Sequence, residues 1–123
     1  MTLKAFRLGA AWWTVAVLGT MIALYALAYL VFRDRMFPPP LAESLRARPW
    51  GIYPHAFFGA IALALGPLQF RRGILLKRRA LHRNLGRVYV AAAVLTGVVG
   101  AYMAWFAYGG PVSRLGFGGL ALA

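Results

Sequence analysis

Few side chains in this chain could do chemistry, and two histidines stand out by their spacing. His55 is followed four residues later by Gly59, and His82 is followed four residues later by Gly86, so each pair lies on one face of a helix. Tyr89 continues the second of these faces. Histidine is a common axial ligand of haem iron, and a glycine leaves room for a flat group or for another helix. The spacing therefore supports two interpretations: haem-binding histidines with the glycines and Tyr89 packed around the group, or interfacial histidines that hydrogen-bond a helix end.

The geometry of consecutive helices restricts the haem interpretation. The helices that begin near His55 and His82 follow one another and are expected to be antiparallel, so the two histidines would lie near opposite membrane faces, on the order of 25 Å apart. They would then be single axial ligands of two separate haems, each completed by a histidine from elsewhere. The cofactor is left open, with haem b as the candidate.

Conventional enzyme chemistry has little support in this sequence. There is no cysteine, which excludes disulfides, thiolate nucleophiles and cysteine metal sites. Asp34 and Glu43 are the only two carboxylates, and with Ser44 and Ser113 they form no hydrolase motif. Zinc normally needs four donors. We therefore expect no catalytic residue and no metal site in this segment.

Half of the fourteen basic residues form one run, and the formal net charge is +12. The members of this basic run are Arg71, Arg72, Lys77, Arg78, Arg79, Arg83 and Arg87. Nucleic-acid binding would require basic residues along one polar face, whereas long uncharged stretches flank this run on both sides. We interpret the run as a membrane-topology signal whose partners are anionic lipid headgroups, and we expect no nucleic-acid partner.

Membrane-spanning helices are the elements that would position these residues. Residues 8–32, 51–70 and 88–113 contain no Asp, Glu, Lys or Arg, and each stretch reaches the roughly 18–20 residues that a spanning helix needs. We predict an all-α integral-membrane protein, an antiparallel bundle that forms a single domain over residues 1–123. The predicted helices cover about 10–32, 52–70 and 81–108, with a partial fourth over 114–123.

Prolines and glycines mark the predicted ends of these helices. The three prolines at 38–40 are expected to hold the chain extended, before a short surface helix within 41–48. Pro54 fits the start of the second spanning helix, and Gly66-Pro67 predicts a kink or an early end. The stretch 109–111, Gly-Gly-Pro, should stop the third helix. Small residues along the second and third helices, such as Gly59 and Gly100, predict close helix packing.

The amino-terminal stretch requires a choice between a secretory signal and a retained helix. Residues 26–28, Ala-Leu-Ala, offer a cleavage pattern, but the apolar run continues to Phe32, and we predict that the helix is retained. Two basic residues precede this helix and seven form the basic run on the same predicted side, against five on the opposite side. The positive-inside rule then places the amino terminus and the basic run in the cytoplasm of a bacterial inner (plasma) membrane.

Three segments carry a family resemblance: "HAFFGAIALALGPLQF" (55–70), "RRALHRNLGRVYVAAAVLTGVVGAYMAW" (78–105) and "GGPVSRLGFGGLALA" (109–123). They resemble a bacterial family of predicted multi-pass membrane proteins of unknown function, and GPLQF and LHRNLGRVYV are the most specific pieces. The resemblance implies a fold but no activity. It also implies that the family's distal half is absent here, which agrees with a fourth apolar segment too short to cross a bilayer. A small intact protein with a short apolar tail is the alternative.

These observations favour a structural or interaction role for the segment, within a homo-oligomer or beside another membrane subunit. The alternative is the haem redox module described above, with His55 and His82 as ligands. A second alternative is a small transporter component, which predicts a polar cavity at mid-membrane depth around Tyr25, Thr96 or Tyr102.

Overall fold

The computed structural model describes residues 3–32, 35, 37–107 and 109–122, and every regular element within them is helical. The elements are α1 (Leu3–Phe32), α2 (Pro39–Arg46), α3 (Pro49–Gln69), α4 (Arg72–Lys77), α5 (Arg79–Trp105) and α6 (Gly110–Leu122). Within the described residues, three helical stretches are long and apolar enough to cross a membrane: Gly9–Phe32, Pro49–Gln69 and Arg79–Trp105. The prediction of an all-α membrane bundle with three spanning helices is confirmed, and α6 is a further apolar helix of 13 residues.

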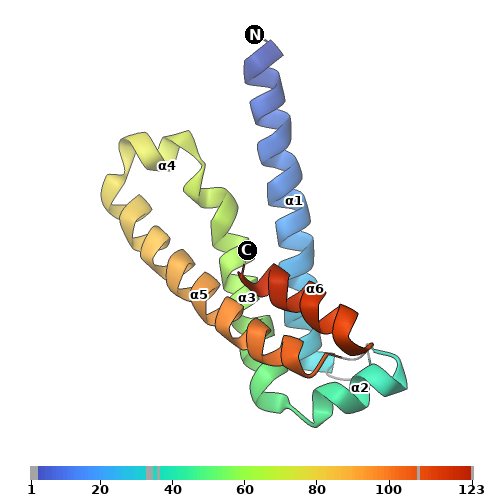
Figure 1. Ribbon diagram of the computed structural model, residues 1–123. Coiled ribbons are helices and arrows are strands. Elements are labelled where there is room, and N and C mark those ends of the chain that lie inside the picture. The colour runs from blue at the N-terminus through green and yellow to red at the C-terminus, as the bar shows by residue number, and fades with distance from the viewer. Residues whose placement is uncertain (1–2, 33–34, 36, 108, 123) are drawn as a thin grey trace.

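Helix α3 is the centre of the bundle, because it packs against α1 on one face and against α5 on another. Both neighbours run antiparallel to it: Trp12 of α1 contacts Pro67 of α3, whereas Tyr29 lies beside Tyr53. Helix α6 folds back along α5. Figure 1 shows the amino end of α1 and helix α4 at one end of the bundle, with α2 and the α5–α6 turn at the opposite end.

The burial pattern is that of a protein surrounded by lipid. Among the residues whose side chains the structure describes, eight hydrophobic ones are buried; six of these are alanines, and the larger two are Tyr29 and Leu45. Bulky side chains lie outside instead: Val31, Val98 and Leu24 are 74%, 64% and 60% exposed. Small residues between helices let backbones approach closely, and bulky apolar residues on the outer face are stable in hydrocarbon. Close contacts between small residues of neighbouring helices therefore stabilise the interior of the bundle.

The prediction that all three prolines at 38–40 are extended is wrong for two of them. Pro38 is extended, with φ −56° and ψ 147°, but Pro39 and Pro40 are the first two residues of α2. Proline is well accommodated there, because the first N–H groups of a helix have no intrahelical partner and the fixed φ of proline suits a helix. In the same way α3 begins at Pro49, so Pro54 lies inside the helix.

The ends of the other helices also differ from the prediction. Helix α1 begins at Leu3, and α5 covers Arg79–Trp105, so it begins two residues earlier and ends three residues earlier than expected. The predicted end at Tyr108 lies outside the described residues. Gly109 and Gly110 have φ of 105° and 80°, a conformation that glycine adopts without strain. They reverse the chain so sharply that α6 begins at Gly110 rather than at 114.

Candidate functional site

The contact between α3 and α5 forms a regular seam, in which a glycine on one helix faces a larger side chain on the other. The pairs of this α3–α5 seam are Gly51 with Met103, Gly59 with Thr96, Gly66 with Tyr89, Gly86 with Gln69, and Gly100 with His55. The approach is close: a Cβ added at Gly86 would lie 3.2 Å from Gln69 Oε1, and one added at Gly59 would lie 3.5 Å from Thr96 Cγ2. Each helix thus supplies both gaps and the side chains that fill them.

His55 crosses the seam from α3 to the backbone of α5. Its Nδ1 lies 3.1 Å from the carbonyl oxygen of Thr96, and because a carbonyl can only accept, Nδ1 carries the proton and donates it. In the neutral ring the lone pair then lies on Nε2. A Cβ added at Gly100 would lie 3.2 Å from His55 Cε1, so this ring packs against Gly100. Gly59, the glycine expected beside His55, lies against Thr96 instead.

His82 lies on α5, one helical turn before Gly86, in a different environment from that of His55. Its Nδ1 is buried and has no hydrogen-bond partner among the described residues, and the same holds for Gln69 Nε2. His55 contacts Thr96, which is fourteen residues along α5 from His82, or roughly 21 Å at 1.5 Å per residue. The structure therefore does not bring the two histidines together.

The contact between α1 and α3 contains a polar feature that the sequence did not indicate. Trp12 Nε1 donates a hydrogen bond of 2.8 Å to the carbonyl oxygen of Pro67. Since proline has no N–H, Pro67 also leaves the carbonyl of Leu63 without its usual helical donor. A Cβ added at Gly19 would lie 3.3 Å from that Leu63 oxygen, so the backbone of α1 approaches that of α3 closely there. Helix α3 continues through Gly66 and Pro67 and ends at Gln69, one residue before the predicted end at 70, so Gly66-Pro67 does not end it early.

The basic run lies at the end of the bundle that holds the amino end of α1 (Figure 1). The described side chains of the run are exposed: Arg71, Lys77, Arg78, Arg79, Arg83 and Arg87. The side chain of Arg72 lies outside the described part of the chain. At the opposite end Arg48 is used internally, since its guanidinium lies 4.3 Å from the centre of the Phe106 ring and donates to the Ser44 carbonyl oxygen at 3.2 Å. The basic run is thus exposed at one end of the bundle, beside the amino end of α1.

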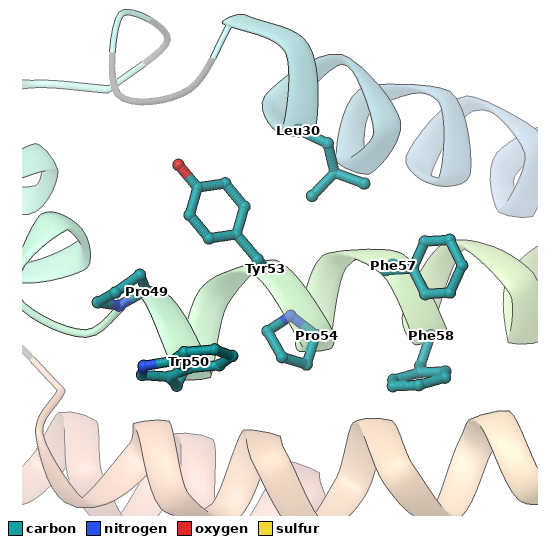
Figure 2. Close-up of a pocket in the computed structure, with 7 residues that line it drawn as sticks. All are labelled: Leu30, Pro49, Trp50, Tyr53, Pro54, Phe57 and Phe58. Carbon is teal, nitrogen blue, oxygen red and sulfur yellow. The ribbon is translucent and has the colours of Figure 1, made fainter.

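An apolar groove opens on α3 near the end that holds α2 (Figure 2). We call it the Trp50 groove. It has a volume of about 550 Å³ and is lined by Leu30 of α1 and by Pro49, Trp50, Tyr53, Pro54, Phe57 and Phe58 of α3. Neither Tyr25, Thr96 nor Tyr102, the residues expected around a transporter cavity, lines this groove. It is a hydrocarbon-lined surface rather than a polar one.

Within the described residues, no three side chains of His, Asp or Glu come together in a way that could hold a metal ion. Asp34 lies outside that part of the chain. Thr96 Oγ1 is the third buried side-chain atom without a partner, after those of His82 and Gln69. Gln69 and Thr96 belong to the α3–α5 seam, and the three atoms are the only ones of that kind among the described residues.

Three apolar spanning helices with small residues at their contacts define an integral-membrane helical bundle. A family described as "Predicted membrane protein (DUF2306)" matches residues 52–123, and the chain belongs to this family of unknown function. The resemblance noted in the sequence is therefore confirmed. Neither the curated proteins nor the solved structures compared with the chain give a match.

Proposed function

We propose that this segment has a structural or interaction role in a bacterial inner membrane, as a packed helical unit that carries no catalysis of its own. The α3–α5 seam is the observation that carries the proposal. Two of its polar side chains take part in helix packing: His55 donates its Nδ1 proton to the Thr96 carbonyl oxygen, and the Gln69 side chain lies against Gly86. A single domain over residues 1–123 remains part of this proposal.

The proposed orientation places the amino end of α1 and the basic run in the cytoplasm. The supporting observation is that these segments lie at the same end of the bundle, whereas α2 and the α5–α6 turn lie at the other (Figure 1). Basic residues are retained on the cytoplasmic side, where anionic lipids attract them at about 1 kcal/mol each. The exposed arginines of the run then contact anionic headgroups.

Cysteine labelling tests this orientation directly, because the chain contains no cysteine of its own. We expect Arg114→Cys, placed on α6 beyond the α5–α6 turn, to react with a membrane-impermeant maleimide in intact spheroplasts. Arg71→Cys should react only after the membrane is opened. Arg71 and Arg114 are both exposed, so the two variants are matched in type and accessibility. The opposite pattern, with Arg71→Cys labelled from outside, contradicts the proposed orientation without affecting the fold.

A haem redox module is the second candidate, and the hydrogen bond of His55 is the observation that favours it. A histidine whose Nδ1–H is held by a carbonyl presents Nε2 to a metal in a fixed orientation. If His55 ligates haem, the chain expressed in membranes with haem supplied should show a stoichiometric Soret band and a sharp reduced α-band. His55→Ala and His82→Ala should each remove part of that absorbance while leaving membrane insertion intact. A featureless spectrum from a well-folded sample favours the structural role and removes the haem candidate.

A further inference from the structure

We propose that the Trp50 groove binds one acyl chain of an anionic phospholipid. The inference goes beyond the structural role and does not depend on which side of the membrane faces the cytoplasm. The groove volume of about 550 Å³ lies within the roughly 300–1,000 Å³ of ordinary ligand pockets. It differs from most of them because it lies on α3, a helix long and apolar enough to cross a membrane.

The polarity of the groove changes along its length, as an amphiphile requires. Figure 2 shows the indole nitrogen of Trp50 and the hydroxyl of Tyr53 toward the Pro49 end, whereas Phe57 and Phe58 present only carbon at the other end. The Pro49 end is the first turn of α3, next to α2, and Phe58 lies further into the span. Trp and Tyr favour the headgroup level of a membrane, because the apolar part of the side chain contacts hydrocarbon there while its N–H or O–H group contacts water. A lipid would therefore lie with its ester and headgroup at Pro49 and its chain along the phenylalanines.

The shape of the lining favours a hydrocarbon chain over a transmembrane helix. Helices associate in membranes through small residues that let their backbones approach. The α3–α5 seam follows this rule, with five glycines at the contact. The Trp50 groove has no glycine, alanine, serine or threonine in its lining, and four of its seven residues are aromatic. Trp50 itself is 86% exposed. A thin, flexible chain can lie between such rings, whereas a second helix would be held away by them.

The charge beside the groove decides which headgroup fits. Arg35 is exposed in the connection between α1 and α3, and Arg48, whose guanidinium lies over Phe106, adds its positive charge directly before Pro49. Glu43 is the single acidic residue among the described residues of this connection. An anionic headgroup is attracted to such a surface, while a zwitterionic one gains little. The partner is therefore an anionic phospholipid such as phosphatidylglycerol.

Fluorescence quenching by brominated lipid tests the proposal, with Trp50 as the reporter. A variant that retains Trp50 alone, with Trp12, Trp13 and Trp105 each changed to Phe, is placed in phosphatidylcholine nanodiscs with rising amounts of dibrominated phosphatidylglycerol. The matched control retains Trp105 alone; it is 72% exposed and lies at the same end of the bundle, outside the groove. We expect half-maximal quenching of Trp50 at roughly a fivefold lower mole fraction than for Trp105, the factor that corresponds to one additional Arg–headgroup contact.

Each other outcome overturns the proposal in a distinct way. Equal curves for Trp50 and Trp105 mean that the groove meets only bulk lipid. Equal quenching by brominated phosphatidylcholine removes the anionic preference. Trp50 shielded from every lipid means that a second copy or another subunit covers the groove.

A second measurement uses the chain with all of its native tryptophans in place. Native mass spectrometry of the detergent-purified chain should show one retained phosphatidylglycerol, and Leu30→Trp, which fills the groove from α1, should remove it. Retention that is unchanged in Leu30→Trp contradicts the proposal independently of the quenching result.

Discussion

Replacing Tyr29 by alanine is expected to lower the free energy of unfolding by roughly 3–5 kcal/mol, the usual cost of deleting a buried aromatic side chain. Tyr29 is 4% exposed and forms the buried cluster with Leu45 of α2 and Ala56 of α3. Its ring also lies 5.1 Å from that of Phe37. The substitution therefore removes the side chain that holds α1, α2 and α3 together, and α2 should lose protection first. Unfolding in mixed micelles by SDS titration, followed by far-UV circular dichroism, measures the total loss.

Tyr25→Ala is the matched control, because Tyr25 lies one turn earlier on α1 but is 50% exposed. A surface substitution of this kind should change the free energy of unfolding by about 0.5 kcal/mol or less. Hydrogen exchange separates the local effect from the global one: in Tyr29→Ala, the amides of α2 should exchange faster than those of α5. If Tyr29→Ala and Tyr25→Ala are equally stable, the cluster does not hold α2 in place.

Replacing Gly100 by leucine should cost roughly 2–4 kcal/mol, the sum of overpacking and of one lost hydrogen bond. A Cβ at this position would lie 3.2 Å from His55 Cε1 and 3.5 Å from the Cβ of Ala121 in α6. The leucine must push the imidazole away from Thr96, and it also separates α6 from α5. The same SDS titration measures the loss. Gly116→Leu on α6 should have little effect, because nothing lies within 4 Å of a Cβ added there.

A double substitution tests whether His55 is the side chain that Gly100 accommodates. His55→Ala alone loses the contact with Thr96, but in the presence of Gly100→Leu it makes room for the new side chain. The double variant should therefore be more stable than the sum of the single losses predicts, by about 0.5–3 kcal/mol. Additive losses of stability would show that His55 and Gly100 act independently. The cost of Gly100→Leu would then come from its contact with α6 alone.

The three spanning helices could be predicted from the sequence because lipid imposes a simple requirement: a long stretch without charge. The ends of these helices could not be predicted in the same way, because a helix can continue beyond the hydrocarbon region of the membrane. Helix α1 continues outward through Lys4 and Arg7 to Leu3, since a lysine or an arginine is a good helix former in water. Pro39 and Pro40 mislead for a related reason, since proline breaks a helix interior but suits its first turn.

The candidate site was predictable in its residues but not in its pairings. The spacing of His55 with Gly59 and of His82 with Gly86 predicts one face of each helix, and His55, Gly59 and Gly86 lie in the seam. It pairs residues within a helix, however, whereas the contacts run between helices: His55 lies against Gly100, and Gly86 against Gln69. The register of two antiparallel helices depends on how their side chains fit together along the whole contact. The spacing of residues within one helix gives no information about that fit.

The reciprocal arrangement of the seam has a consequence for how this protein can change over evolutionary time. Since each gap on one helix is occupied by a side chain of the other, a residue larger than alanine at Gly66 requires a smaller one at Tyr89. Any side chain at Gly51 requires Met103 to shift or to be replaced by a smaller residue. Relatives should therefore exchange these positions in pairs. Sliding α5 by one turn would set filled positions against filled ones, so the two helices tolerate compensated substitutions while keeping a single alignment.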